Sequence, residues 1–369
     1  MTAINIRLHR CEDDSQIFDM QQMVYPDHPL YRDRSLTAKY WQWRYFSNPA
    51  IQSFVFVATV DGGKTIAGMR PLSIVSVKVG QRIRKALWLT AVITHPAYRK
   101  RGIFSALVKH SLQHAKDMGV DIAYTFPNHN SYPIYQKKPQ WRTLANIPIL
   151  VRPLNYRGLV LKSFRRVLGA AENHEIRQTM PSFADADLHN GDSSLFQLRM
   201  TRHVDHEYTR LWDNVSQEIQ VALPRNRDYL KWRYLDCPVL PYELIEARDA
   251  HQRLLGYTVI GLQNRQGMAM GLVVDLLFYS NATRAAQSLL KAGLRRLKAL
   301  GADLACALPA NNPRLRRLLA RQGLRPLPNF IRGGRVNFIG TIINPGLASD
   351  DPFLNFDNWY LTWGDTDNA

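Results

Sequence analysis

The sequence predicts an α/β protein of two homologous units, each a mixed, mostly antiparallel sheet flanked by helices. Three observations support this prediction: the length of 369 residues, which exceeds a single hydrophobic core, an internal repeat, and the same order of apolar segments after each copy of it. The composition, with 46% hydrophobic and 10% aromatic residues, is typical of a folded globular chain and excludes a disordered one.

The internal repeat consists of two pairs of motifs. "YWQWRYFSNP" and "YLKWRYLDCP" share Tyr, Trp-Arg-Tyr and Pro at the same spacing, and Trp232 lies 189 positions after Trp43. "GVDIAYTFPNHN" and "GADLACALPANN" share Gly, Asp, Ala, Pro and Asn, and Gly301 lies 182 positions after Gly119. Because the Trp-Arg-Tyr triplet recurs, we expect it to hold a helix against the sheet. The alternative is that Arg44 binds an anionic group of a substrate.

The elements follow one another in the same order in both units. In the first unit, the alternating segments "SFVFVATV" and "GMRPLSIVSVKV" predict two antiparallel strands, and "LWLTAVIT" predicts a third. A helix after Gly102 is predicted from one apolar face, formed by Phe104, Leu107, Val108, Leu112 and Ala115, and Gly119 ends it. The second unit repeats this order with "YELIEARD", "LLGYTVIGLQ", "GLVVDLLF" and a helix from about Thr283 to Leu300. Antiparallel strands followed by a strand, a helix and a strand predict a mixed sheet.

The predicted boundaries are residues 1–152 for an N-terminal domain, 153–200 for a linker and 201–369 for a C-terminal domain. The linker contains "YRGLVLKSFRRVLGAA", which predicts a basic amphipathic helix, followed by a polar stretch. Such a helix either packs its apolar face on a domain as a connector or rests on an anionic membrane surface.

The charge balance and the cysteines restrict the class of protein. The formal net charge is +18, so the surface attracts phosphates, nucleic acid or anionic lipid headgroups. Cys11, Cys237 and Cys306 lack metal-ligand spacing, so we expect free thiols, a reducing compartment and no metal site. The N-terminal segment lacks the apolar run of a secretory signal, and no stretch of eighteen apolar residues occurs. We therefore expect a cytoplasmic protein that does not span a membrane.

The stretch "VITHPAYRKRGIFSALVKH" places a glycine and three cations at the mouth of a predicted helix. A helix N-terminus offers unpaired N–H groups and the positive end of its dipole, which together bind anions. Gly102 lets the backbone approach a ligand closely, and Arg99, Lys100 and Arg101 add positive charge at the same point. This pattern predicts a diphosphate site, and the alternative is a basic turn that faces water.

These residues resemble the GNAT superfamily of acyl-CoA-dependent N-acyltransferases. Its signature of Arg or Gln, two residues, Gly, one residue and Gly or Ala corresponds to Arg99, Gly102 and, as a departure, Phe104. The resemblance implies that the loop holds the coenzyme A pyrophosphate and that the preceding strand lies along the pantetheine. The residues implied in cofactor binding are Ala91, Val92, Ile93, Arg99, Lys100, Arg101, Gly102, Ile103, Phe104 and Asn130.

A second part of the resemblance lies in "FPNHNSYPIYQKKPQW". Asn130 and Tyr135 fit the family pattern, whereas Pro139 stands where Gly is usual and Trp141 falls one place later than the usual Phe. The resemblance implies that Tyr135 protonates the departing thiolate. This is chemically reasonable, because a phenol held near the sulfur can donate its proton as the tetrahedral intermediate collapses. The alternative is an aromatic residue that packs at the edge of the sheet.

The second unit lacks the features of the first at the corresponding place. "YSNATRAAQSLL" has no glycine and only Arg284 as a cation, so we expect one acyl-donor site in the first unit and a degenerate second copy. The general base is not identified by the sequence. The candidates are Asp61, Asp121, His95, His129 and the C-terminal Asp365 and Asp367, for which an edge strand with a polar tail is the alternative.

The sequence therefore predicts an N-acyltransferase that moves an acetyl or other acyl group from coenzyme A to a small or envelope-related primary amine. The alternatives are an aminoacyl-tRNA-dependent, Fem-like tandem transferase, a transferase that takes its acyl group from an acyl carrier protein, and a noncatalytic basic protein that binds nucleic acid. The last has one pattern in its favour, the arginine-rich helix in "NPRLRRLLARQGLRP", but no nucleic-acid motif accompanies it. Nucleic acid is therefore not the expected partner.

Overall fold

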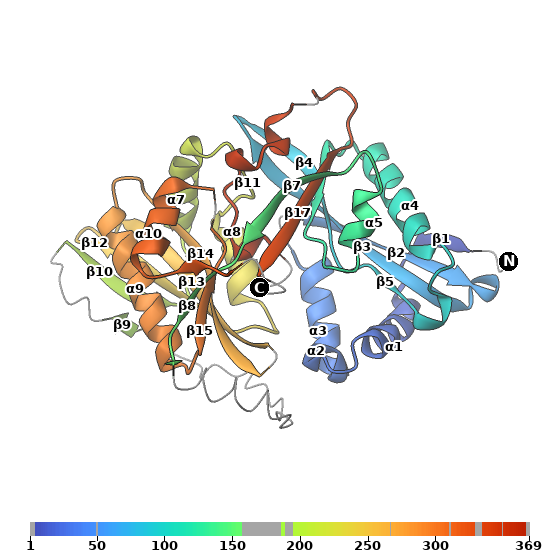
Figure 1. The fold of residues 1–369 in the computed structure, drawn as a ribbon, viewed down its shortest axis with the longest axis horizontal. Coiled ribbons are helices and arrows are strands. Elements are labelled where there is room, and N and C mark those ends of the chain that lie inside the picture. The colour runs from blue at the N-terminus through green and yellow to red at the C-terminus, as the bar shows by residue number, and fades with distance from the viewer. Residues whose placement is uncertain are drawn as a thin grey trace. The chain divides into compact units, whose positions relative to one another are not determined.

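The computed structural model describes residues 4–48, 51–156, 186–188, 195–265, 267–309, 311–328, 334–348 and 350–366. These residues form two compact units (Figure 1). Unit 1 contains Met1–Lys78, Arg82–Leu144 and Phe338–Leu354, and unit 2 contains Val79–Gln81, Ala145–Asn337 and Asn355–Ala369. The three ranges predicted from the sequence are consecutive, whereas both units are assembled from separate parts of the chain. The amphipathic helix predicted within 153–200 falls largely outside the described residues.

Unit 1 is a sheet with helices on both faces. The strands of its sheet are β1 (Asn5–Leu8), β2 (Ile51–Val60), β3 (Thr65–Val79), β4 (Arg82–Leu89), β5 (Ile93–Thr94), β6 (Ile122–Thr125), β7 (Arg142–Pro148) and β17 (Arg335–Ile342). β7 and β17 extend past the unit boundaries at Leu144 and Phe338. Its helices are α1 (Asp14–Val24), α2 (Pro29–Arg32), α3 (Arg34–Tyr45), α4 (Ile103–Asp117) and α5 (Tyr132–Gln136). The strand order is β1-β2-β3-β4-β6-β17-β7, with β5 paired to β3. β4 and β6 are parallel, whereas β1 with β2, β2 with β3 and β6 with β17 are antiparallel.

The two faces of this sheet carry separate hydrophobic clusters because side chains alternate along each strand. Phe56 and Ala58 of β2 pack with Leu107 of α4 on one face. Val55 and Val57 pack on the other face, in a cluster that includes residues of α1 and α3. The apolar face predicted for the helix after Gly102 is thus the face that α4 buries against the sheet.

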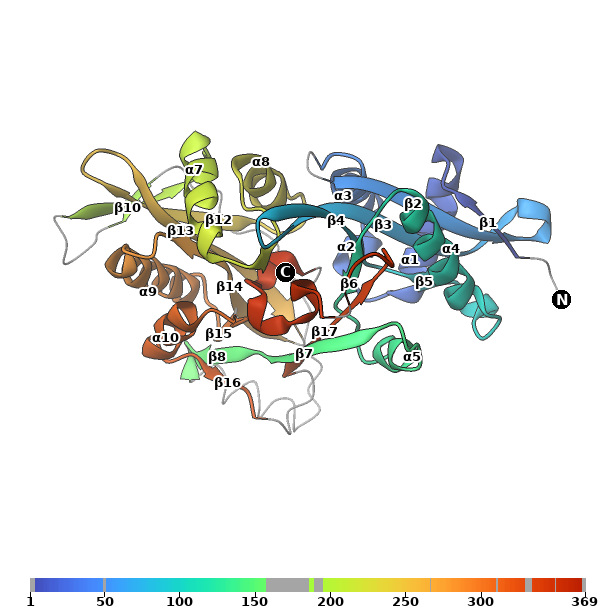
Figure 2. The same cartoon turned by 90° about the horizontal axis from the view of Figure 1, so that it is seen from above.

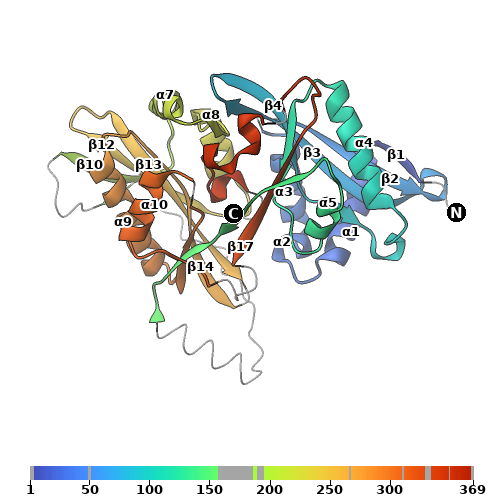
Figure 3. The same ribbon diagram turned by 45° about the horizontal axis from the view of Figure 1, so that its top comes forward.

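Strand β17 comes from the C-terminal part of the chain but completes the sheet of unit 1. It pairs antiparallel with β6, from Ile339 opposite Thr125 to Ile342 opposite Ile122. Figure 3 shows this red strand beside the green β7. Asn344, which follows β17, donates a hydrogen bond to Asp121 at 2.9 Å and so fixes the end of the strand.

Unit 2 repeats the same plan. Its strands are β8 (Leu150–Pro153), β9 (Ala186–Leu188), β10 (Phe196–Thr201), β11 (Val221–Ala222), β12 (Tyr242–Asp249), β13 (Leu254–Arg265), β14 (Met268–Phe278), β15 (Leu304–Ala307) and β16 (Arg325–Pro326). Its helices are α7 (His206–Val215), α8 (Arg227–Leu230), α9 (Thr283–Ala299) and α10 (Pro313–Arg321). The strand order is β16-β8-β15-β14-β13-β12-β10-β9, with β14 and β15 parallel. Two mixed, mostly antiparallel sheets with flanking helices confirm the predicted fold class.

Strand β8 plays in unit 2 the part that β17 plays in unit 1. It comes from the N-terminal half of the chain and lies between β15 and β16, antiparallel to both (Figure 2). Each sheet is therefore completed by a strand that the other half of the sequence supplies. Since this exchange depends on pairing between distant segments, the internal repeat could not reveal it.

The repeated motifs occupy matching places in the two units. Gly119 and Gly301 end helices α4 and α9 with positive φ angles of 67° and 84°, the left-handed conformation that favours glycine. In the strands that follow them, β6 runs parallel to β4 and β15 runs parallel to β14. Both Trp-Arg-Tyr triplets are buried. Arg44 lies over the ring of Trp88 at 4.1 Å, and Arg233 donates to the carbonyl of Gly364 at 3.2 Å.

Two local predictions differ from the structure. The segment "LWLTAVIT" is not one strand, because β4 ends at Leu89 and the chain resumes pairing only at Ile93. The C-terminal aromatic segment is not an edge strand but forms short 3-10 turns, Phe356–Asn358 and Trp363–Asp365, with a single bridge between Trp359 and Val221. None of the helices in the described part of the chain combines the length and apolar character that a bilayer crossing requires.

Candidate functional site

The centre of the unit 1 sheet contains a break in the pairing of β4. β4 pairs in parallel with β6 only as far as Trp88 opposite Tyr124. Ala91 then takes a φ angle of 40°, and Ile93 pairs instead with Met69 of β3. A residue in this left-handed region redirects the strand, as in a β-bulge. β4 thus turns away from β6, and Ala91 is exposed, Val92 half-buried and Ile93 buried.

The loop after β5 presents the basic residues to solvent. Pro96–Tyr98 form a 3-10 turn in which the Nδ1 atom of His95 accepts a hydrogen bond from the Ala97 N–H at 3.2 Å. Arg99, Lys100, Arg101 and Gly102, which follow this turn, are exposed. The guanidinium of Arg101 lies 5.1 Å from the ring centre of Tyr98. His95, a candidate base in the sequence, thus helps to shape the loop.

The start of α4 has the geometry of an anion site. Lys100 and Gly102 have φ angles of 63° and 81°, and Gly102 is the N-cap of the helix. The first helical hydrogen bond runs from the Ala106 N–H to the Gly102 carbonyl at 2.9 Å. The N–H groups of Ile103 and Phe104 precede this bond and have no acceptor among the described residues. The space beside Gly102 is open, because a Cβ atom there would meet nothing within 4 Å. The helix therefore directs free donors and its positive dipole end to an open surface.

Tyr135 lies at the buried side of this region. Its side chain is 4% exposed, and its ring packs edge-on against Trp141 at 4.9 Å and Phe104 at 6.2 Å between ring centres. The departure from the family signature at Phe104 therefore places an aromatic ring beside the predicted acid. The hydroxyl oxygen of Tyr135 accepts a hydrogen bond from Nη2 of Arg70, at 3.3 Å.

Arg70 is a residue that the sequence analysis did not identify. It lies in β3 and is 0% exposed. A cation in the middle of the otherwise apolar "GMRPLSIV" was the available signal, because charged residues are almost never fully buried unless paired. Its significance depends on the contact with Tyr135, which comes from 65 residues further along the chain.

Other candidate residues are placed elsewhere. Asn130 is exposed, and it is Asn128 that shapes the loop before α5, since its Oδ1 accepts from the N–H groups of Asn130 and Ser131. Asp121 is held by Asn344, and Asp61 accepts from the Tyr98 hydroxyl at 3.4 Å. The remaining candidate bases are the exposed His129, and Asp367, which falls outside the described residues.

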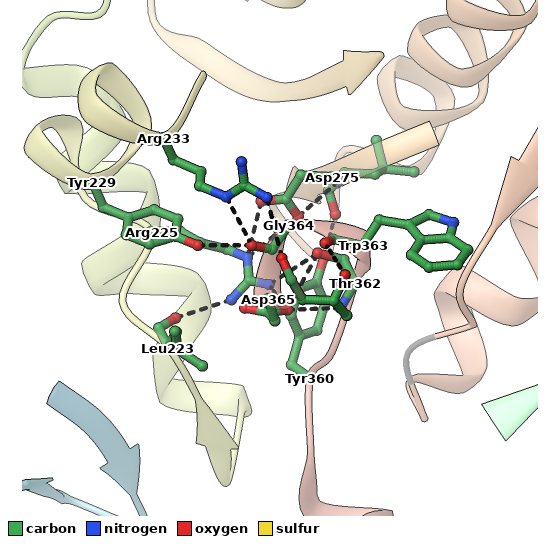
Figure 4. Close-up of polar contacts among 12 residues, drawn as sticks. Leu223, Arg225, Tyr229, Arg233, Asp275, Tyr360, Thr362, Trp363, Gly364 and Asp365 are labelled. Atoms are coloured by element: carbon green, nitrogen blue, oxygen red, sulfur yellow. Dashed lines mark hydrogen bonds and ion pairs between the residues drawn. The ribbon is translucent and has the colours of Figure 1, made fainter. Parts of the chain in front are cut away.

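Asp365 lies in unit 2, in a buried cluster centred on Arg225 (Figure 4). Arg225 contacts Asp275 through Nε at 3.1 Å and Asp365 through Nη2 at 2.6 Å, and all three side chains are at most 1% exposed. The Asp365 carboxylate also accepts from the Thr362 N–H at 2.7 Å, and the Tyr234 hydroxyl donates to Asp275 at 3.1 Å. Within unit 2, Asp365 is thus part of a network that positions the C-terminal segment.

Burial and the neighbouring charges have opposite effects on the pKa values of Arg225 and Asp365. Burial lowers the pKa of Arg225, but the carboxylates of Asp275 and Asp365 outweigh it, so that the pKa rises well above its ordinary value. Burial raises the pKa of the Asp365 carboxyl, and the positive charge of Arg225 only partly offsets that rise. Burial and the nearby Asp275 also raise the pKa of Tyr234.

The corresponding helix starts of unit 2 lack the features found in unit 1. The N-cap of α9 is Ala282, which provides no side-chain hydrogen bond, and the one nearby cation, Arg284, is exposed. Helix α10, which follows β15 as α5 follows β6, contains no tyrosine. α10 buries Leu315 and directs Arg314 outward, where it pairs with Glu218 at 2.8 Å.

Comparisons with known proteins agree with this geometry. Residues 5–141 match the family described as Acetyltransferase (GNAT) domain. This match confirms the resemblance found in the sequence and covers the elements from β1 to the end of α5. No curated protein matches the chain at a significant level.

Several solved structures share the fold across both units. A GCN5-related N-acetyltransferase from Anabaena variabilis aligns with a TM-score of 0.59 at 14% identity, over 93% of this chain and 73% of that chain. A tandem GNAT protein from the clavulanic acid biosynthesis pathway aligns with a TM-score of 0.55 at 15% identity, over 93% and 99%. Saccharomyces cerevisiae N-myristoyltransferase with bound myristoyl-CoA aligns with a TM-score of 0.58 at 10% identity, over 92% and 79%. At these identities the likeness shows the fold alone.

Proposed function

We propose that the protein is an N-acyltransferase, because residues 5–141 match the GNAT domain family and the chain shares its fold with a tandem GNAT protein. The proposed donor is acetyl-CoA or another acyl-CoA, and the proposed acceptor is the primary amine of a small or cell-envelope-related molecule. One observation carries the proposal: the break in β4 after Leu89 and the left-handed Gly102 at the start of α4 occur together.

The donor would lie along the broken strand and end at the helix. In this arrangement the N–H groups of Ile103 and Phe104 bind the pyrophosphate, and Arg99, Lys100 and Arg101 supply positive charge around it. The pantetheine arm lies against the backbone of residues 91–93, whose neighbour β6 has ended its pairing with β4. Asn130, in the exposed loop before α5, is kept as a cofactor contact on the resemblance alone.

Tyr135 would act as the general acid. The amine nitrogen attacks the thioester carbonyl, a C–N bond forms, and a tetrahedral intermediate results. When the C–S bond breaks, its electron pair passes to sulfur, and the Tyr135 hydroxyl supplies the proton that makes the free thiol. The nitrogen loses a proton to a base or to solvent. The buried ring of Tyr135, packed against Trp141 and Phe104, keeps the hydroxyl in one position for this transfer.

The acyl group and its carrier are part of the proposal. The N-myristoyltransferase structure contains myristoyl-CoA, so the fold admits long acyl chains in that protein. The exposed Arg99–Arg101 segment also favours a second candidate, an acyl carrier protein as donor, because acidic carriers suit a basic rim. A Fem-like transfer from aminoacyl-tRNA would equally use the charge of +18. Cys11, Cys237 and Cys306 are not joined in disulfides, which favours a reducing, cytoplasmic location.

Titration calorimetry with acetyl-CoA tests the donor site, with Gly102→Asp and Gly102→Asn as a matched pair. Both side chains tolerate positive φ, so the pair differs by one negative charge at the same position. We expect Gly102→Asp to weaken binding at least about tenfold relative to Gly102→Asn, because the new carboxylate repels the pyrophosphate. Equal affinities would refute the proposed phosphate contact.

If the wild type binds neither acetyl-CoA nor longer acyl-CoAs, the coenzyme donor is wrong. Binding to a carrier protein or to charged tRNA is then measured directly. Retention on heparin that salt, but not coenzyme A, reverses would favour the noncatalytic nucleic-acid alternative.

A further inference from the structure

Arg70 is a buried cation whose partners do not account for its charge. Its side chain is 0% exposed, and its Nε and Nη1 atoms have no hydrogen-bond partner among the described residues. Its one hydrogen bond goes from Nη2 to the neutral hydroxyl of Tyr135 at 3.3 Å. Burying a charge without a counter-ion is costly, and such groups tend to occur where function requires them. The structure of unit 1 alone gives no stabilising reason for an arginine at this position.

Its place in the sheet connects Arg70 to the proposed reaction. Met69 pairs with Ile93, so the next residue, Arg70, stands beside the point where the chain between β4 and β5 is irregular. Side chains alternate along β3, so Arg70 faces the same side as Gly68. A Cβ atom on Gly68 would lie 2.8 Å from Ile103 of α4, which identifies this side as the α4 face. Arg70 thus lies between the break in β4 and Tyr135.

The donor and acceptor chemistry of the pair fixes the direction of the hydrogen bond. A guanidinium carries only donors, so the Tyr135 oxygen accepts from Arg70. The phenolic proton of Tyr135 cannot point to Arg70 and remains available to another acceptor. A carboxylate or carbonyl in place of Arg70 would accept a hydrogen bond from the phenol, and the phenolic proton would then not be available to another acceptor. The contact therefore prepares Tyr135 to donate a proton and not to accept one.

We propose that Arg70 is a positioning residue that orients the Tyr135 hydroxyl as proton donor and neutralises the phenolate formed after the transfer. This inference rests on the proposed N-acyltransferase function. As the C–S bond breaks, the proton moves from the Tyr135 oxygen to sulfur and leaves a phenolate beside the guanidinium. The proton lost by the amine nitrogen restores the phenol through solvent. Since the described residues place no carboxylate against Arg70, its charge is available to the phenolate.

A double-mutant cycle with acetyl-CoA tests this role. CoA release is followed by thiol detection, with water or any active amine from a panel of primary amines as acceptor. We expect Arg70→Met to lower kcat about 10- to 100-fold while the Kd for acetyl-CoA stays within about twofold. In the Tyr135→Phe background, Arg70→Met should change kcat by less than about twofold, because its effect passes through the missing hydroxyl. Arg70→Lys, which keeps the charge, should recover part of the loss.

Three results would overturn the inference. Equal losses in the wild-type and Tyr135→Phe backgrounds would show that Arg70 acts independently of the phenol. A loss confined to Kd or KM would show that Arg70 holds a substrate group, such as a carboxylate of the acyl chain or the acceptor. A clearly lower unfolding temperature for Arg70→Met would show a structural role, since removing an unpaired buried charge should leave stability equal or higher.

These outcomes are separate from the failure of the proposed function. If the wild type binds acetyl-CoA and releases CoA while the cycle is additive, only the role of Arg70 is refuted. If the wild type does neither, the N-acyltransferase proposal fails and the role of Arg70 with it. An Arg70→Met variant that does not fold counts as the third result above and refutes the role of Arg70, whatever the wild type does with acetyl-CoA.

Discussion

The two units each bury an arginine, and they treat its charge in opposite ways. In unit 2, Arg225 contacts two carboxylates, Asp275 and Asp365, and the hydroxyl of Thr362. In unit 1, the one hydrogen bond of Arg70 within the described part of the chain goes to a neutral phenol. Both side chains are fully buried. The charge of Arg225 holds the fold through two carboxylates, whereas the charge of Arg70 has no carboxylate partner among the described residues and, in our proposal, serves the reaction.

The same contrast holds where the central strand of each sheet becomes irregular. In unit 2, the pairing of β13 and β14 shifts register between Val259 and Ile260, next to Asp275. At this irregularity Arg225 donates a hydrogen bond to the Asp275 carboxylate, and the Tyr360 hydroxyl donates to the Leu276 carbonyl. In unit 1, the equivalent break at Ala91 leaves an exposed backbone beside a glycine-led helix. An irregularity in the central strand of each sheet thus serves packing in unit 2 and, in the proposed function, binding in unit 1.

The largest effect is expected from removing the charge of Arg225. Arg225→Leu leaves Asp275 and Asp365 buried without a counter-ion and should lower the free energy of unfolding by about 3–5 kcal/mol. Denaturant titration measures this loss, and Arg70→Met is the matched comparison, for which no loss is expected. Similar losses for both variants would remove the distinction between the two arginines.

A second prediction concerns the proposed acid. Tyr135→Phe should lower kcat about 10²-fold, because general acid catalysis typically contributes that much, while the ring keeps its contacts with Trp141 and Phe104. The measurement is CoA release at saturating acetyl-CoA, and Tyr132→Phe is the control from the same helix. An unchanged kcat would mean that another group protonates the thiolate.

A third prediction compares the basic residues at the two helix starts. Replacing Arg99, Lys100 and Arg101 together with serine should weaken acetyl-CoA binding about 10- to 100-fold, because three positive charges around the pyrophosphate are lost. Arg284→Ser, in the first turn of α9, should leave the affinity unchanged. Titration calorimetry measures the acetyl-CoA affinity of both variants. Equal losses of affinity would indicate long-range attraction by the net charge instead of a local site.

The smallest effect is a difference in pH dependence between the units. Burial raises the pKa of Asp365, so its contribution to stability is present below about pH 4 and falls as pH rises through the folded pKa. For Asp13, burial would raise the pKa, but the hydrogen bonds from Arg7 lower it. Its contribution is therefore present above about pH 4 and is lost as pH falls through the folded pKa.

Asp13→Asn should accordingly cost about 1 kcal/mol or less at pH 7, and the difference from wild type should shrink toward pH 3. Asp365→Asn should instead flatten the decline of stability above pH 4. Thermal unfolding of both variants over pH 3–7 provides the comparison. Parallel curves for the two variants would contradict the assigned pKa directions.

The repeat, the order of the elements and the place of the proposed anion site could all be predicted from the sequence alone. The period of the apolar residues indicated the helix at 103–117, and Gly102 with Arg99–Arg101 marked its start, because these signals depend on neighbours along the chain. Tyr135 was likewise found from its local motif. The fold class followed from the order of such segments.

The contacts between residues far apart in the sequence, in contrast, could be known only from the folded structure. The exchange of β17 and β8 between the sheets, the burial of Asp365 against Arg225, and the contact of Arg70 with Tyr135 all join positions far apart in the sequence. The break in β4 also depends on a neighbouring strand, since Ile93 pairs with Met69. Periodicity records which face a side chain takes, but a counter-ion or a strand partner is fixed by long-range packing, which no local pattern encodes.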